Sequence, residues 1–77
     1  MIPERTKATI DNYAKNLWQP GGFVYAVLTN NLKEAFGRAD EENSNAMKEI
    51  VKYVYNNIPA IAWGSEENVK RWLAQKK

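Results

Sequence analysis

The sequence predicts a compact all-α domain, because apolar residues recur along it at helical spacing. Two series follow the i, i+3, i+4, i+7, i+8 rule, which places each of them on one stripe of a helix. The first series consists of Ile10, Tyr13, Ala14, Leu17 and Trp18, and the second of Met47, Ile50, Val51, Val54 and Ile58. Two apolar faces in a chain of 77 residues must cover each other, so we expect one domain over 1–77.

Size and composition limit what holds this domain together. A chain of 77 residues without cysteine has one small core and no disulfide to support it. Its expected stability is on the order of 4–11 kcal/mol, at roughly 0.05–0.15 kcal/mol per residue. Three Trp, four Tyr and two Phe add large buried areas to that core. We expect four helices, at about 3–17, 22–36, 40–57 and 65–75.

The first helix begins at Pro3, because the first turn of a helix does not need the N–H that proline lacks. It ends before Pro20, Gly21 and Gly22, which favour a turn. One of the two glycines is expected to supply a residue with positive φ.

The second helix carries the apolar residues Val24, Val27, Leu28, Leu32 and Ala35 on one face. Asn30 and Asn31 interrupt it, which leaves two interpretations. Asn31 followed by Glu34 has the spacing of a capping box, at which one helix stops and another starts. We favour a single helix with a local defect, ending at Gly37 in the left-handed conformation.

The third and fourth helices have recognisable N-caps. Asp40 precedes Glu41 and Glu42, which place negative charge at the positive end of the helix dipole. This helix ends at Ile58, because Pro59 pushes the residue before it out of the α region. Ser65 caps the last helix in the same way. Its buried side is formed by Val69, Trp72 and Leu73.

Composition argues against catalysis. The chain has no histidine and no cysteine, which removes the usual proton shuttle, thiol nucleophile and metal ligands. The paired carboxylates stand at helix starts, where acidic residues are routine. We therefore expect no enzyme activity, no catalytic residue, no cofactor and no metal site.

Nucleic-acid binding is a weaker alternative. The net charge is only +2, and the excess of positive charge lies in the last eight residues. A reading helix at 40–57 would present acidic residues to phosphates in its first turn, which disfavours a helix-turn-helix. The basic end can still contact a phosphate backbone. The residues concerned are Lys70, Arg71, Lys76 and Lys77.

Binding of a partner is the favoured class, with a site around the turn at Gly37. Arg38 lies in that turn, and its guanidinium can hold a carboxylate or phosphate in fork geometry. Tyr, Trp and Arg also anchor protein interfaces. The same groups allow a second alternative, sequestration of a small anionic, nucleotide-like ligand. The predicted binding residues are Asn30, Asn31, Arg38, Asp40, Asn43, Tyr53, Tyr55 and Trp63.

Motifs along nearly the whole chain resemble those of small proteins from bacteriophage and prophage genomes. They are Pro20-Gly21-Gly22-Phe23, Ala26-Val27-Leu28-x-Asn30, Gly37-Arg38-Ala39-Asp40-x-x-Asn43, Ile50-Val51-x-Tyr53, Tyr55-Asn56, Pro59, Trp63-Gly64-Ser65, Val69 and Trp72-Leu73. The resemblance implies a phage setting, and it implies no particular chemistry or site residue.

These observations lead to one functional hypothesis. We expect a small non-enzymatic phage accessory protein that binds a host or phage protein, for example to inhibit a host enzyme or defence system. No apolar run approaches the ~20 residues that a bilayer span needs, and no leader pattern is present, so we expect a cytoplasmic protein without membrane contact. A homodimer stays open, because the core is small and aromatic residues are in surplus.

Overall fold

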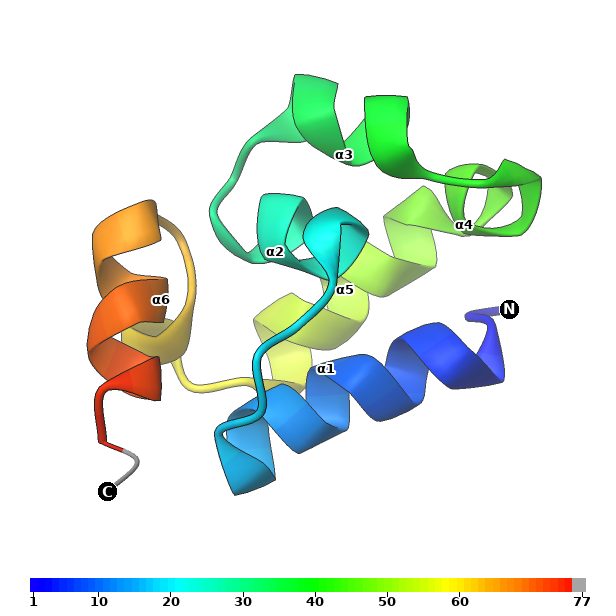
Figure 1. The fold of residues 1–77 in the computed structure, drawn as a ribbon. Helices are drawn as coiled ribbons and strands as arrows, with labels where there is room; N and C mark the ends of the chain where they lie inside the picture. The colour runs from blue at the N-terminus through cyan, green and yellow to red at the C-terminus, as the bar shows by residue number, and fades with distance from the viewer. Residues whose placement is uncertain (76–77) are drawn as a thin grey trace.

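The computed structural model describes residues 1–75, and within them helices are the only regular secondary structure. This confirms the predicted all-α class. The helical elements are α1 (Glu4–Asn16), α2 (Gly22–Leu28), α3 (Leu32–Arg38), α4 (Glu41–Asn45), α5 (Met47–Asn57), the 3-10 turn η1 (Ala60–Ala62) and α6 (Glu66–Leu73). In Figure 1, α1 and α3 lie on opposite sides of α2 and α5, and α6 stands beside this stack. No helix of the described part is long and apolar enough to cross a membrane.

The predicted helix at 22–36 is two helices, so the single helix with a defect was the wrong interpretation. Asn30 has φ 63° and closes α2 in a Schellman motif. In it, the Asn31 N–H donates to the Ala26 carbonyl at 2.9 Å and the Asn30 N–H to Val27 at 3.2 Å. The Asn31 side chain then accepts from the Glu34 N–H at 3.3 Å and caps α3. Adjacent asparagines allow this because one tolerates the left-handed region and the next is a good N-cap.

Two glycine predictions were also wrong. Gly37 lies inside α3, so it does not end the helix in the left-handed conformation. Gly21 has φ −71° and Gly22 is the first residue of α2. The positive φ after α1 belongs instead to Leu17, at 57°, because the chain leaves that helix before it reaches the glycines.

The predicted helix at 40–57 is interrupted at Ala46, which separates α4 from α5. The residues before the break are Asn43, Ser44 and Asn45, whose side chains compete for backbone hydrogen bonds. The predicted N-caps Asp40 and Ser65 are confirmed, at the starts of α4 and α6. The Asn43 N–H donates to Asp40 at 2.8 Å, and the Asn68 N–H donates to Ser65 at 3.1 Å.

The centre of the core lies between α1, α2, α5 and α6. Its largest fully buried side chains are Ile10, Tyr13, Leu28, Ile50 and Val69. The two apolar stripes are therefore covered along their centres. At their edges they are not, since Trp18 is 55% and Val51 47% exposed.

Tyr13 and Trp72 join the C-terminal part to α1. The Tyr13 hydroxyl donates to the Ala62 carbonyl at 2.5 Å, and the Trp72 indole N–H donates to the Tyr13 carbonyl at 3.3 Å. These bonds satisfy polar groups at the edge of the core and hold η1 and α6 against α1.

Gly37 and Gly64 differ in backbone conformation, so replacing each with alanine should change the stability in opposite directions. Gly37→Ala should stabilise the protein by roughly 0.5–1 kcal/mol, because alanine favours a helix interior and nothing lies within 4 Å of the added Cβ. Gly64→Ala should destabilise it by about 1–2 kcal/mol, because Gly64 has φ +104°. Urea unfolding measures both changes. Destabilisation by Gly37→Ala would show that α3 ends before residue 37.

Candidate functional site

The predicted binding residues do not form one surface. Some of them line two separate hollows, and others make contacts within the fold. Arg38 lines a polar cleft, Asn30 and Trp63 line an apolar groove, and Asn31 lies between the two hollows and lines both.

Asp40 and Asn43 have structural roles at the start of α4. Asp40 caps that helix. The Asn43 side-chain oxygen accepts a hydrogen bond from the Thr6 hydroxyl at 2.6 Å, which ties α4 to α1. Neither residue lines the cleft or the groove, so the structure does not place them in a hollow together with Arg38.

Tyr53 is likewise engaged within the fold. Its hydroxyl donates to the Asp11 carboxylate at 2.5 Å, and the Lys7 Nζ lies 5.6 Å from its ring centroid. The hydrogen bond to Asp11, with burial and the charge of Asp11, raises the pKa of Tyr53 to about 12. Tyr53 therefore joins α5 to α1 and stays protonated at neutral pH.

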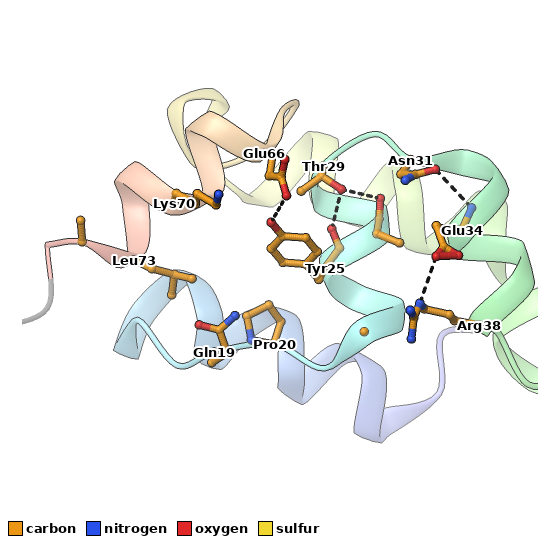
Figure 2. Close-up of a pocket in the computed structure, with 13 residues that line it drawn as sticks. Gln19, Pro20, Tyr25, Thr29, Asn31, Glu34, Arg38, Glu66, Lys70 and Leu73 are labelled. Carbon is orange, nitrogen blue, oxygen red and sulfur yellow. Dashed lines mark hydrogen bonds and ion pairs between the residues drawn. The ribbon is translucent and has the colours of Figure 1, made fainter.

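We call the polar hollow the Arg38 cleft. It has a volume of about 890 Å³ and lies between the α1–α2 connection, α2, α3 and α6. Figure 2 shows Tyr25 in its middle, with Arg38 and Lys70 on different sides. The lining residues are Gln19, Pro20, Gly22, Tyr25, Ala26, Thr29, Asn31, Glu34, Arg38, Glu66, Lys70, Leu73 and Ala74.

Most charged groups of the Arg38 cleft already have partners. The Arg38 Nε lies 3.5 Å from a Glu34 carboxylate oxygen, in a half-exposed ion pair one turn apart on α3. The Tyr25 hydroxyl donates to Glu66 at 3.0 Å, and burial together with Glu66 raises the pKa of Tyr25. Two carboxylates, Glu34 and Glu66, and two cations, Arg38 and Lys70, line the cleft, so its lining offers an anion no net positive charge.

Gly22 allows Arg38 to lie where it does. A Cβ on Gly22 would stand 2.9 Å from the Arg38 Nη1, so the guanidinium covers the start of α2 closely. The sequence predicted only a turn at Gly22, and this packing role was missed. Tyr25 and Glu66 of the cleft were missed too, because an isolated Tyr and a capping Glu carry no distinctive spacing.

One of the two basic residues of α6, Arg71, pairs with a neighbouring carboxylate. An Arg71 guanidinium nitrogen lies 3.5 Å from Glu67, and another donates to the Asn68 side chain at 3.3 Å. Lys70 lines the Arg38 cleft on the same side as Glu66. The other two residues of the predicted phosphate-contacting set, Lys76 and Lys77, lie outside the described residues.

We call the apolar hollow the Trp63 groove. It has a volume of about 240 Å³ and lies between α2, α3, α5 and the segment after η1. Eight of its ten lining residues are apolar or aromatic, and the remaining two are asparagines. They are Ala26, Val27, Asn30, Asn31, Leu32, Ala35, Met47, Val51, Val54 and Trp63.

Hydrogen bonds fix the position of Trp63 at the groove. Its indole N–H donates to the Ile58 carbonyl at 3.1 Å, and its own carbonyl accepts from the Asn68 side chain at 2.9 Å. The next residue, Gly64, donates its N–H to the Leu28 carbonyl at 2.7 Å. The ring is thus held in place without any partner molecule.

Large apolar side chains stand exposed at the rim of the groove. The exposed fractions are 61% for Leu32, 47% for Val51 and 71% for Tyr55. The rings of Tyr55 and Trp63 meet edge to face with centroids 6.0 Å apart. Tyr55 and Trp63 were predicted binding residues and the structure brings them together. Leu32 and Val51 were predicted as core, because periodicity identifies a stripe but not the part of it that a neighbour covers.

No protein-family model, curated protein or solved structure matches this chain. In the described part of the chain, no three His, Cys, Asp or Glu side chains are grouped so as to hold a metal ion.

Proposed function

We propose that this protein is a non-enzymatic interaction module that binds another protein through the Trp63 groove. The observation that carries the proposal is the combination of an apolar groove with exposed Leu32, Val51 and Tyr55 at its rim. Exposed apolar patches with a preformed hollow are typical of protein interaction sites. Trp and Tyr are the side chains most often found as binding hot spots.

The three rim residues alone do not supply enough free energy for stable binding. Fully burying one large apolar side chain contributes about 1.5–3 kcal/mol, so the three rim residues together contribute at most about 5–9 kcal/mol. Association costs about 4–15 kcal/mol in lost freedom of motion. A partner must therefore also fill the groove with a side chain of its own, which makes shape as well as apolar character a condition of binding.

The partner class follows from the resemblance to small phage proteins noted in the sequence. In that setting the partner is a host or phage protein in the host cytoplasm, and inhibition of a host enzyme or defence system is one consequence of binding.

A single charge in the groove tests the proposal. Val51→Asp places a carboxylate on the groove lining, where a docked partner would remove it from water. We expect a partner captured from phage-infected cells and then purified to bind the variant at least tenfold more weakly in calorimetry.

Trp18→Asp is the matched control, because Trp18 is also an exposed apolar residue, lies just after the end of α1 and does not line the groove. It should leave the affinity unchanged. Circular dichroism of both variants shows that the fold is kept. Equal binding of wild type and Val51→Asp would overturn the proposal.

A further inference from the structure

We infer that the segment bound by the Trp63 groove is an amphipathic helix with acidic residues beside its apolar stripe. This inference rests on the proposed function and names the chemistry of the partner. It is carried by lysines that accompany the exposed apolar residues on both helices of the rim.

Helical spacing places two lysines of α5 next to the exposed apolar residues of that helix. On α5, Lys48 and Lys52 lie three residues before Val51 and Tyr55 respectively, and are themselves one turn apart. Side chains three or four residues apart are neighbours on a helix surface. Both lysines are exposed, so they lie along the outer edge of the Val51–Tyr55 pair.

The opposite side of the groove repeats the arrangement. On α3, Leu32 and Phe36 are exposed one turn apart, and exposed Lys33 lies three residues before Phe36. We call Lys33, Lys48 and Lys52 the lysine rim. It borders the apolar rim on both helices.

The carboxylates of these two helices lie elsewhere. On α3, Glu34 pairs with Arg38 and lines the Arg38 cleft. On α5, Glu49 is about 160° around the helix axis from Val51, at 100° per residue. Neither carboxylate lines the groove. Along α3 and α5 the charged side chains next to the apolar rim are therefore the three lysines, although the whole chain carries only +2, and charge complementarity favours an acidic partner.

The shape favours a helix over a flat surface. The groove is concave and is bordered by α3 and α5. A helix presents apolar anchors at i, i+3, i+4 and i+7 that enter such a groove, while its flanks meet the rim on either side. Glutamates on those flanks would lie opposite the lysine rim.

A second copy of this chain fits the same surface less well. In a two-fold symmetric dimer the same patch meets itself, so the lysine rim would meet another lysine rim across the interface. Like charges placed together oppose association. A lipid surface fits less well too, since it calls for a protruding apolar face, and here the apolar centre is recessed.

A library of helical peptides tests the inference. Displayed 18-residue peptides carry Leu, Phe or Trp at i, i+3, i+4 and i+7, and their flanking positions are drawn equally from Glu, Lys and Gln. We expect selection against the whole protein to enrich Glu over Lys at least threefold at these positions.

Charge reversal supplies the matched controls. A selected peptide should bind K33E/K48E/K52E at least tenfold more weakly than wild type. It should bind K7E/K15E/K70E, which changes the net charge equally away from the groove, with less than a threefold loss. Circular dichroism checks that both variants fold.

The outcomes separate this inference from the proposed function. Peptides that lose binding with Val51→Asp but show no preference for Glu overturn the inference and leave the proposed function standing. The absence of any peptide sensitive to Val51→Asp contradicts both. A dimer in sedimentation that Val51→Asp dissociates, or binding to phosphatidylglycerol vesicles through the lysine rim in place of peptides, also overturns the inference.

Discussion

Ile50→Ala is expected to destabilise the protein by about 2–5 kcal/mol, the usual range for truncating a buried isoleucine. Ile50 is 0% exposed and belongs to the central core cluster with Ile10, Leu28 and Val69. The cost combines the lost burial of the side chain with the cavity left behind. Since the whole domain is expected to hold on the order of 4–11 kcal/mol, this one change should remove a large share of its stability.

Urea unfolding at neutral pH measures the effect. Ile61→Ala is the matched control, because it makes the same chemical change at a side chain that is 67% exposed. It should shift the free energy of unfolding by no more than about 0.5 kcal/mol. Similar losses for the two variants would contradict the position of the core between α1, α2, α5 and α6.

Tyr13 is expected to make the fold sensitive to alkali. Burial, with a smaller contribution from Tyr25, raises the pKa of Tyr13 to about 12 from its ordinary value of 10.0. The folded state therefore keeps a proton that the unfolded state loses above pH 10. Stability contributed by this tyrosine is fully present below pH 10 and is lost as the pH rises from 10 toward 12.

Tyr13→Phe tests this role in two ways. At neutral pH it leaves the Ala62 carbonyl without the hydroxyl donor that now lies 2.5 Å away, at a cost of about 1–3 kcal/mol. Above pH 10 the variant should lose less stability than wild type. Some alkaline loss will remain, because Tyr53 also has a pKa raised to about 12.

Melting temperatures at pH 7, 9, 10 and 11 give the measurement. Tyr55→Phe is the control, since the Tyr55 side chain is mostly exposed and it should follow the wild-type profile. An alkaline profile of Tyr13→Phe identical to wild type would show that the Tyr13 hydroxyl is not buried.

The sequence predicted where helical segments begin and end with good accuracy, because caps and prolines act locally. Asp40 and Ser65 cap helices, and Pro59 follows the end of α5. It did not predict the breaks inside the segments. At Asn30 the local sequence allowed both a continuous helix and a break, and the structure has the break, with Asn30 in the left-handed conformation and Asn31 as the N-cap of α3.

The structure groups the predicted binding residues differently from the sequence. It brings the rings of Tyr55 and Trp63 together, whereas Asp40 and Asn43 lie outside the cleft that Arg38 lines. Leu32 and Val51 were missed because a short helix in a small domain is covered along part of its apolar stripe only. Which part stays open depends on how α3 and α5 are placed, and spacing along the chain carries no such information.

The most direct test of the central claim is a nuclear magnetic resonance titration of the isotope-labelled protein with its captured partner. We expect the Trp63 indole N–H and the backbone signals of Leu32, Val51 and Tyr55 to shift on binding. Shifts confined to the Arg38 cleft or to the exposed side of α1 would contradict binding at the Trp63 groove.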